Sequence, residues 1–532
     1  MMRLLRHFSV FCLSYLFVSP FIHAQEKGII SGDLMLNSDY YINDDRIGTN
    51  TTQYERELNS AESWLYLNYR VKGYSFSVRY DLFNNSPLLD PEEAYTEQGL
   101  AFFSIKKEIG DLEVTVGSFY DQFGSGIIFR AYEDRTIGLD YAIEGVRVKY
   151  DFSETMRVKA FTGKQKFRFT TQDAVLQGAN FEKDFLISDK LQVFSGFAAL
   201  NRTMTTSTTN LIADEINSYP LEERFVPRQN VYSFSGYSDI RFGRFSLYTE
   251  YAYKTSEAIN NEAGNRFIES DGDLLYTSLN YSQKGFGLNV QYKLSNQYVI
   301  RTSPFTTFLE GIVSFLPPIT KQHSLRLPAR YSPAVQEFGE DGFQIDMTYS
   351  PDRRSTFSAN YSLINNAFGE RIFREAYFDY YRVHNRKLKT TVGFQTLIYD
   401  QDIFEGKPGV PLVYSYTPFA EIAYKITRKK SLRMELQYLR TDQDQGDLAF
   451  ILLEYNVAPK FSISVSDMIN TRPQLLDEDI IHYYTIFGVY TLKQTRFSLG
   501  YVKQIEGVVC TGGVCRVEPA FSGVRFGLTT NF

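Results

Sequence analysis

Apolar and polar residues alternate with a period of two along nearly the whole chain. Within residues 343–350, the odd positions hold Phe, Ile, Met and Tyr, whereas the even positions hold Gln, Asp, Thr and Ser. A turn at residues 351–354 separates this segment from residues 356–363, where the alternation resumes, and residues 65–82 and 286–294 repeat it. Because successive side chains of a β-strand point to opposite faces, the pattern predicts a long array of β-hairpins with one apolar face.

The apolar face could line a soluble core or contact lipid, and the length of the chain separates these alternatives. A soluble β-sandwich of 532 residues would split into domains, but the sequence shows no linker, composition shift or similar repeat. Aromatic residues make up 16% of the chain, with 39 Tyr and 44 Phe against a single Trp, Trp64. This composition is typical of transmembrane β-barrels with aromatic girdles. We therefore predict an all-β fold, a single antiparallel transmembrane barrel with a polar lumen.

Short and long connections alternate between the predicted strands. Short turns occur at residues 72–73 and 351–354, whereas the links at residues 202–229, 256–271 and 297–340 are longer and polar. Outer-membrane barrels show this asymmetry, with short periplasmic turns and long extracellular loops. The pattern predicts about 24 strands, within a range of roughly 22 to 26, and bacterial single-chain barrels have an even number.

The first residues are typical of a secretory signal peptide. Two arginines precede an apolar stretch at residues 8–22, and Ala24 ends a suitable cleavage site. A retained membrane anchor is the alternative, but the stretch is shorter than the roughly 18 apolar residues that a spanning helix needs. We predict a signal peptide at residues 1–24 and a barrel at residues 25–532.

The end of the chain resembles the C-terminal β-signal of outer-membrane proteins, which the barrel-assembly machinery binds during biogenesis. In that pattern, a terminal aromatic residue follows a glycine five positions earlier, and a polar residue stands two positions before the glycine. Phe532, Gly527 and Arg525 match these positions, but Thr530 stands where an apolar or aromatic residue is usual. The resemblance implies that the protein is located in a bacterial outer membrane, in contact with its lipids.

Charge and cysteine content restrict the partners and the compartment. The formal charge is −6 with both signs mixed along the chain, which argues against nucleic acid as a partner. Cys510 and Cys515 remain after removal of the signal peptide, and two of the four residues between them are glycines. Because exported proteins commonly form disulfides, we predict a bridge between these two residues, with two free thiols as the alternative.

One link combines a glycine-rich turn with a concentration of charge. Apolar residues follow the turn at residues 124–126, and Arg130, Glu133, Asp134 and Arg135 come next. Glycine lets the backbone approach a wall closely, and charges folded into a lumen form a selective constriction. We predict that these four residues form a constriction. An external loop with solvated ion pairs is the alternative.

A second link is too apolar for a freely solvated loop. Its large apolar side chains should be buried inside the barrel as a plug, against a partner protein, or over the barrel rim. They include Phe305, Phe308, Ile312, Phe315 and Leu316.

Enzymatic signals are weak. Only His323, His384 and His482 remain after removal of the signal peptide, and none lies in a hydrolase or metal-binding motif. We therefore predict a protein that is not an enzyme and that binds no cofactor or metal.

Residues 117–150, GSFYDQFGSGIIFRAYEDRTIGLDYAIEGVRVKY, resemble a group of uncharacterised outer-membrane barrels from Bacteroidota. The resemblance implies the location and the fold, but no substrate. It is compatible with a pore or with an accessory subunit of an outer-membrane assembly or secretion complex. We expect a porin-like channel for polar solutes, and the alternative is a non-conducting accessory subunit docked on an outer-membrane protein partner.

Overall fold

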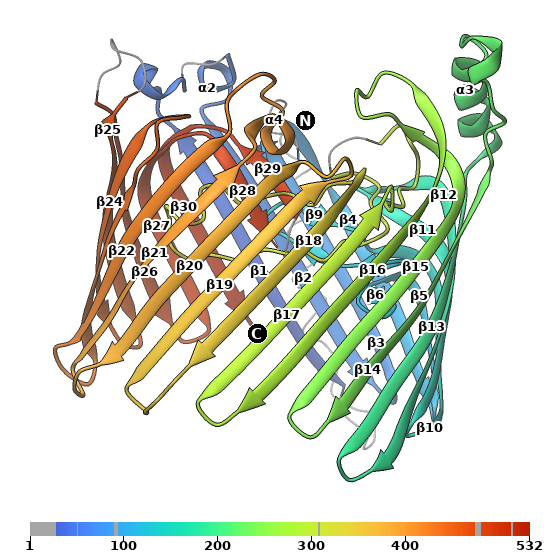
Figure 1. Cartoon of the computed structure of the whole chain (residues 1–532), viewed down its shortest axis with the longest axis horizontal. Coiled ribbons are helices and arrows are strands. Elements are labelled where there is room, and N and C mark those ends of the chain that lie inside the picture. Colours follow the sequence, from blue (N-terminus) through green and yellow to red (C-terminus); the bar gives the residue numbers. More distant parts are fainter. Residues whose placement is uncertain (1–27, 50–51, 90–93, 307–308, 474–479, 512–513) are drawn as a thin grey trace, which may run out of the picture.

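The computed structural model describes residues 28–49, 52–89, 94–306, 309–473, 480–511 and 514–532 (Figure 1). The predicted signal peptide at residues 1–24 lies outside these residues. The described chain forms one closed ring of strands, with short turns at one rim and longer connections at the other. We call these the short-turn rim and the long-loop rim.

A single antiparallel sheet of 24 strands makes the wall, which confirms the predicted barrel and its strand number. Its strands are β1 (Ile29–Tyr41), β2 (Asn59–Val71), β3 (Tyr74–Ser86), β4 (Tyr95–Ile109), β5 (Leu112–Phe119), β10 (Ile143–Ser153), β11 (Met156–Phe167), β12 (Thr170–Ser188), β13 (Leu191–Thr203), β14 (Asn230–Phe242), β15 (Phe245–Asn260), β16 (Phe267–Gln283), β17 (Phe286–Asn296), β18 (Gly339–Tyr349), β19 (Ser355–Asn366), β20 (Arg371–Val383), β21 (Leu388–Tyr399), β22 (Val413–Lys425), β23 (Lys430–Leu439), β24 (Asp447–Val457), β25 (Phe461–Arg472), β26 (His482–Leu492), β27 (Thr495–Gln504) and β30 (Phe521–Asn531).

Shorter elements lie in the connections. The strands are β6 (Asp121–Gln122), β7 (Arg130–Ala131), β8 (Glu133–Asp134), β9 (Leu139–Asp140), β28 (Gly507–Thr511) and β29 (Val514–Glu518), and the helices are η2 (Asp45–Ile47), α2 (Thr52–Glu57), α3 (Thr206–Ile216), η3 (Leu221–Glu223) and α4 (Gln401–Glu405). Among the described residues, no helix is long and apolar enough to cross a membrane.

The first and last strands close the ring. β30 pairs with β27 on one side and with β1 on the other, and the register places Asp39 opposite Arg525. The backbone N–H of Phe532 donates to the carbonyl of Gly32 at 3.0 Å, and the N–H of Gly32 donates back at 2.9 Å. The last strand therefore has paired neighbours on both sides and leaves no edge in the ring.

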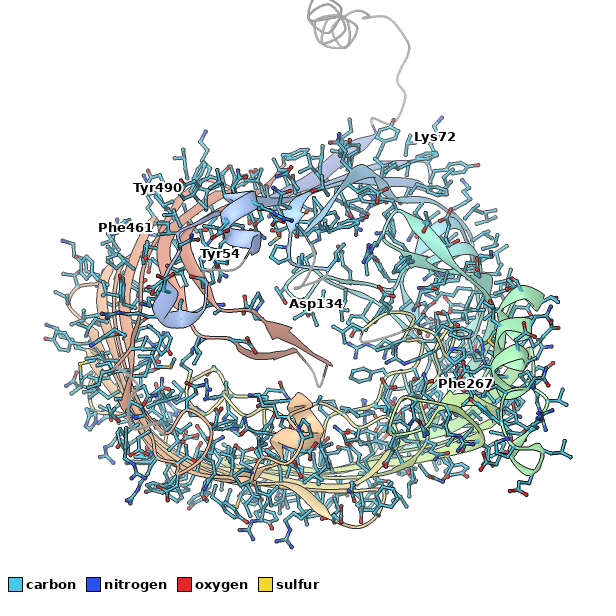
Figure 2. All side chains as sticks on the ribbon, turned by 90° about the horizontal axis from the view of Figure 1, so that it is seen from above. Tyr54, Lys72, Asp134, Phe267, Phe461 and Tyr490 are labelled. Atoms are coloured by element: carbon cyan, nitrogen blue, oxygen red, sulfur yellow. The ribbon has the colours of Figure 1, made fainter. Side chains whose placement is uncertain are left out.

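The outer face of the wall is apolar, as the alternation predicts. On β25, Phe461, Ile463 and Val465 are exposed, whereas the intervening serines are partly covered inside the ring. Phe461 and Tyr490 occupy opposite positions in the β25–β26 register and point outward near the short-turn rim (Figure 2). Outward aromatic residues at the ends of strands are typical of the girdles of membrane barrels.

One predicted long link is wrong. Residues 256–271 belong mostly to β15 and β16, and only residues 261–266 connect the two strands. These strands extend beyond the rim of their neighbours (Figure 1), where the alternation of apolar and polar residues is lost. Beside them, Ile212 and Ile216 of α3 pack on Ala258 and Phe267.

Candidate lumen site

The connection between β5 and β10 folds into the ring, and we call residues 120–142 lumen loop A. Its apolar residues Phe123, Ile127, Ile128 and Phe129 are at most 1% exposed. They pack against inner side chains of the wall, including Phe161 of β11, whose ring is centred 4.3 Å from that of Phe129. The polar lumen therefore contains an apolar core.

The glycine-rich turn of lumen loop A fits closely against β15. The N–H and Oγ of Ser125 donate to Oε2 of the buried Glu250 at 3.0 and 2.7 Å. Gly124 has a φ of +53°, and a Cβ there would lie 2.9 Å from Oε1 of Glu250 and 3.0 Å from the ring of Tyr237. Glycine is required here both by the backbone conformation and by the short distance to the wall.

The connection between β17 and β18 also folds inward, and we call residues 297–338 lumen loop B. The N–H of Arg130 in loop A donates to the carbonyl of Val313 at 2.9 Å, and that of Phe315 donates to the carbonyl of Gly126 at 3.1 Å. The two loops therefore pair with each other. Gln165 of β11 donates to the carbonyl of Ile312 at 2.6 Å and holds loop B against the wall.

An ion-pair network on the wall fixes the second half of loop A. Arg79 of β3 is 2% exposed in its side chain and pairs with Asp81 at 2.7 Å, Glu133 at 2.7 Å and Asp140 at 2.5 Å. Lys166 of β11 also pairs with Asp140. Burial by itself would raise the pKa of Asp140, but the charges of Lys166 and Arg79 outweigh it and hold this pKa below its ordinary value.

The structure brings together only part of the predicted constriction. Arg135 lies 2.7 Å from Glu133 and 3.2 Å from Asp33 of β1. The guanidinium group of Arg130 instead stacks on aromatic rings. Its Cζ lies 4.4 Å from the ring centroid of Tyr132 and 4.0 Å from that of Phe315.

The remaining candidate of the four, Asp134, accepts hydrogen bonds from the backbone N–H and the Oγ1 of Thr136 at 3.0 and 2.5 Å. Figure 2 shows it within the ring. All four candidates are partly exposed. Their role as a constriction stays a prediction.

The predicted plug residues occupy different environments in loop B. Leu316 is buried, and Ile312 and Phe315 are half-buried inside the ring. Phe305 is 44% exposed and packs edge-on against Phe267 of β16, with ring centroids 5.4 Å apart. Phe308 lies outside the described residues. Docking of this loop on a partner stays a prediction.

The second half of loop B crosses to the far wall through polar contacts. Gln395 of β21 donates to the carbonyl of Pro328 at 2.9 Å, and the N–H of Leu327 donates to Gln437 of β23 at 2.8 Å. His323 contacts Glu375 of β20 through a short hydrogen bond.

Near the long-loop rim, Arg330 and the hydroxyl of Tyr331 contact one carboxylate oxygen of Asp444 at 2.8 and 2.9 Å. Burial by itself would raise the pKa of Asp444, but the charge of Arg330 outweighs it and holds this pKa below its ordinary value.

Coverage of the inner wall is uneven. We call the middle of β11–β17 the covered arc, because the lumen loops bury its inner residues: Glu250, Lys254 and Lys293 are each 0% exposed. We call the inner face of β22–β27 toward the short-turn rim the uncovered arc. Its inward side chains are partly exposed, among them Ser462, Ser464, Ser466, Thr485 and Ser498.

One cluster of charged groups on the uncovered arc carries a negative excess, and Lys425 and Arg496 also occupy inward positions of this arc. Arg433 lies 3.0 Å from Glu421 and 3.5 Å from Glu454, and it also contacts Glu435. One cation therefore faces three carboxylates. The side chains of Arg433, Glu421 and Glu454 are 36%, 29% and 25% exposed, so their charges act on solvent inside the ring.

The β28–β29 hairpin extends across the interior of the ring (Figure 2). Its backbone register places Cys510 directly opposite Cys515. The side chains of both cysteines lie outside the part of the chain that is described, and the disulfide stays a prediction.

The residues of the predicted β-signal lie in β30. Arg525 is 3.4 Å from Asp39 and 3.6 Å from Glu518, and a Cβ at Gly527 would lie 2.5 Å from Oγ of Ser498. Phe532 is 55% exposed on the outer face. Their signalling role stays a prediction. Within the described ranges, no group of three His, Cys, Asp or Glu side chains is placed to bind a metal ion.

Sequence reasoning missed the ion-pair network of loop A, which joins Asp140 of the loop to Asp33, Arg79, Asp81 and Lys166 of the wall. A signal existed, since Arg79 and Asp81 are two positions apart and therefore share the polar face of one strand. Their partners come from distant strands and from a loop, and no spacing in the sequence specifies those contacts.

A family model matches residues 4–532, almost the whole chain, and its description is a family of unknown function, DUF6029. The chain belongs to this family. No curated protein matches this DUF6029 chain.

Solved structures similar to the DUF6029 chain include the P pilus usher PapC translocation pore, at 8% identity and a TM-score of 0.45, with 94% of this chain and 99% of the usher covered. The siderophore receptor PirA from Pseudomonas aeruginosa has 8% identity and a TM-score of 0.42, with coverage of 94% and 80%. OccK5 from Pseudomonas aeruginosa has 11% identity and a TM-score of 0.33, with coverage of 82% and 97%.

Proposed function

We propose that this DUF6029 protein is an outer-membrane channel for polar solutes. The closed wall with an apolar outer face supports a membrane location, because every backbone hydrogen-bonding group of a spanning sheet must be paired. The export signals at both ends of the sequence indicate the outer membrane of a bacterium such as a member of the Bacteroidota. The long-loop rim then faces outward.

The observation that carries the channel function is the uneven coverage of the inner wall. The lumen loops pack against the covered arc, and Ser466 at mid-height on β25 stays partly exposed whereas Glu250 at mid-height on β15 is 0% exposed. Water and polar solutes have hydroxyl and charged partners along the uncovered arc. Loop A, with Glu133, Asp134 and Arg135 partly exposed, forms the constricting side of this passage.

Two clusters of carboxylates along the passage favour cations. Arg433 faces three carboxylates, and Arg525 faces Asp39 and Glu518. Rings of carboxylates select for cations in pores because they lower the energy of positive charge in a partly screened space. The protein is then a passive channel and not an enzyme, and folding would depend on the barrel-assembly machinery.

Ion selectivity in planar lipid bilayers tests the proposal. We expect a steady single-channel conductance and a reversal potential that shows a preference for K⁺ over Cl⁻. Glu421→Gln combined with Glu454→Gln should lower the permeability ratio about twofold, because two partly screened charges are removed. Glu222→Gln in η3, outside the ring, is the matched control and should leave the ratio unchanged. A folded barrel without conductance would refute the channel function.

The alternative, an accessory subunit, is favoured by one surface. The loop that contains α3 and η3 exposes Leu211 by 60%, Leu221 by 82% and Val226 by 83%. Exposed apolar side chains that gather on one loop are typical of docking surfaces. If the barrel does not conduct, and if Leu221→Ser with Val226→Ser releases an outer-membrane protein that copurifies with the wild type, the accessory function replaces the channel.

A further inference from the structure

A charged hollow lies on the outer face of the wall, at the long-loop rim beside β25–β27. Its volume is about 730 Å³, and its lining includes Asp44, Arg46, Asp467, His482 and Lys503. Asp467, His482 and Lys503 belong to the outer face, since they share its alternating positions with lipid-facing side chains of the same strands. Charged residues on this face are expensive in a membrane protein and indicate a specific role.

The charges of the hollow pair with each other only in part. Lys503 lies 2.5 Å from Asp44, and Nδ1 of His482 lies 2.7 Å from Oδ2 of Asp467. Oδ1 of Asp467 is buried and has no hydrogen-bond partner among the described residues. Arg46 is exposed, and no ion pair joins it to a described side chain. One exposed cation and one buried carboxylate oxygen without a described partner therefore lie at the same hollow.

An apolar groove of about 430 Å³ adjoins the hollow on the outer face of β22–β25. Small side chains form its floor, among them Ala420 and Ala449, and Leu436 and Tyr438 lie beside them. Asp467 lines both the groove and the charged hollow. The apolar groove leads to a hollow that carries both positive and negative charges at the membrane rim. This arrangement matches the acyl chain and the charged headgroup of a lipid molecule.

We propose that the hollow and the groove bind one diacyl phospholipid with a phosphoethanolamine headgroup. Arg46 receives the phosphate, Oδ1 of Asp467 accepts a hydrogen bond from the ammonium group, and one acyl chain follows the groove past Ala420 and Ala449. The inference rests on the membrane location in the proposed function and does not depend on conduction.

The carboxylates of the hollow decide between headgroups. A purely anionic headgroup would meet Asp44, Asp45 and Asp467 without a compensating cation of its own. A choline headgroup carries positive charge but has no N–H group to donate to Oδ1 of Asp467. Phosphoethanolamine supplies both the anion and the N–H donors, and hydrogen bonds between charged groups are the strong ones.

Native mass spectrometry of the purified, delipidated barrel tests the site. Dioleoyl lipids with ethanolamine, choline or glycerol headgroups are added separately at equal concentration, and the bound fraction is measured. The wild type should retain the ethanolamine lipid about tenfold more tightly than the other two, as expected for one added charge-assisted contact. Arg46→Ala with Asp467→Asn should abolish this preference.

Matched controls separate the site from general rim charge and from folding. Arg228→Ala with Glu269→Gln removes a rim arginine and its carboxylate, which lie 3.7 Å apart beside β14 and β16, and should leave the preference intact. Arg46→Ala alone changes only an exposed side chain and should still weaken retention if the double variant does not fold. Equal retention of the three lipids by the wild type, or an unchanged preference in the folded variants, would overturn the site. Conductance should be unaffected by these variants, so a non-conducting barrel refutes the channel and leaves this test valid.

Discussion

The covered arc and the uncovered arc have the same strand geometry but opposite surroundings on their inner faces. Glu250, Lys254 and Lys293 on the covered arc are fully buried, whereas Arg433 on the uncovered arc keeps 36% of its side chain exposed. Buried charges need close partners, and partly exposed ones are screened by water. The comparison shows that the lumen loops, and not the strands, determine which parts of the inner wall are packed and which face solvent.

The largest effect is expected from the buried ion pairs that hold loop A. Arg79→Met leaves Asp81, Glu133 and Asp140 without their shared cation, and we expect a loss of about 3–5 kcal/mol in the free energy of unfolding. Arg433→Met, its counterpart on the uncovered arc, should cost less than about 1 kcal/mol. Both losses can be measured by urea unfolding in detergent, with the folded fraction determined from the heat-dependent shift in electrophoretic mobility. Similar losses in the two variants would remove the distinction between the arcs.

The close fit of loop A against the wall should be the next most sensitive feature. Gly124→Ala forces a side chain into a left-handed backbone conformation and against Glu250, and we expect a loss of about 1–3 kcal/mol. Gly236→Ala on β14 is the matched control, because no atom lies within 4 Å of its Cβ position. If Gly124→Ala is as stable as Gly236→Ala, loop A is not held as tightly as the contacts indicate.

Acid should weaken the contact between loop B and Asp444. The pKa of Asp444 is below its ordinary value of 3.8 in the folded barrel, so its contribution is present above pH 3.8 and is lost as the pH falls through the lowered value. Loss of this charged hydrogen bond should cost about 1–2 kcal/mol. The Asp444→Asn variant should have a lower free energy of unfolding than the wild type at pH 7, and this free energy should fall less on acidification. The exposed control Asp214→Asn should behave like the wild type when urea unfolding is measured across the same pH range. Parallel pH profiles for all three proteins would contradict the prediction.

The smallest effect concerns the charges of loop A that face solvent. Arg130→Ala with Arg135→Ala leaves Asp33 without its cation and leaves Glu133 paired with Arg79 alone. We expect the reversal potential to shift toward cation preference, with a change of less than about twofold in the permeability ratio. Arg228→Ala, outside the ring, controls for a general change in charge. An unchanged reversal potential in a conducting barrel would mean that these residues form no constriction.

Much of the wall could be predicted from the sequence, because alternation is a local property of each strand. The polar link expected at residues 256–271 was wrong, since β15 and β16 extend beyond the rim, where the alternation of the membrane-spanning part no longer holds. The inward folding of loop A was suggested by Gly124 and Gly126. Its partners could not be predicted, because the contact between Arg130 and Val313 joins segments separated by most of the covered arc.

The pairing of β1 with β30 sets an order for assembly. Both lumen loops belong to the interior of the sequence, whereas the ring is completed only by the two ends of the chain. The two loops can therefore pack against the inner face of the sheet before the ring closes. The hydrogen bonds between Gly32 and Phe532 then form last and enclose the loops in the barrel. If the ring closed before its loops had folded, the loops would have to enter the lumen through one rim. A defect in the last strand would therefore leave a sheet whose loops are already packed but whose first and last strands are unpaired.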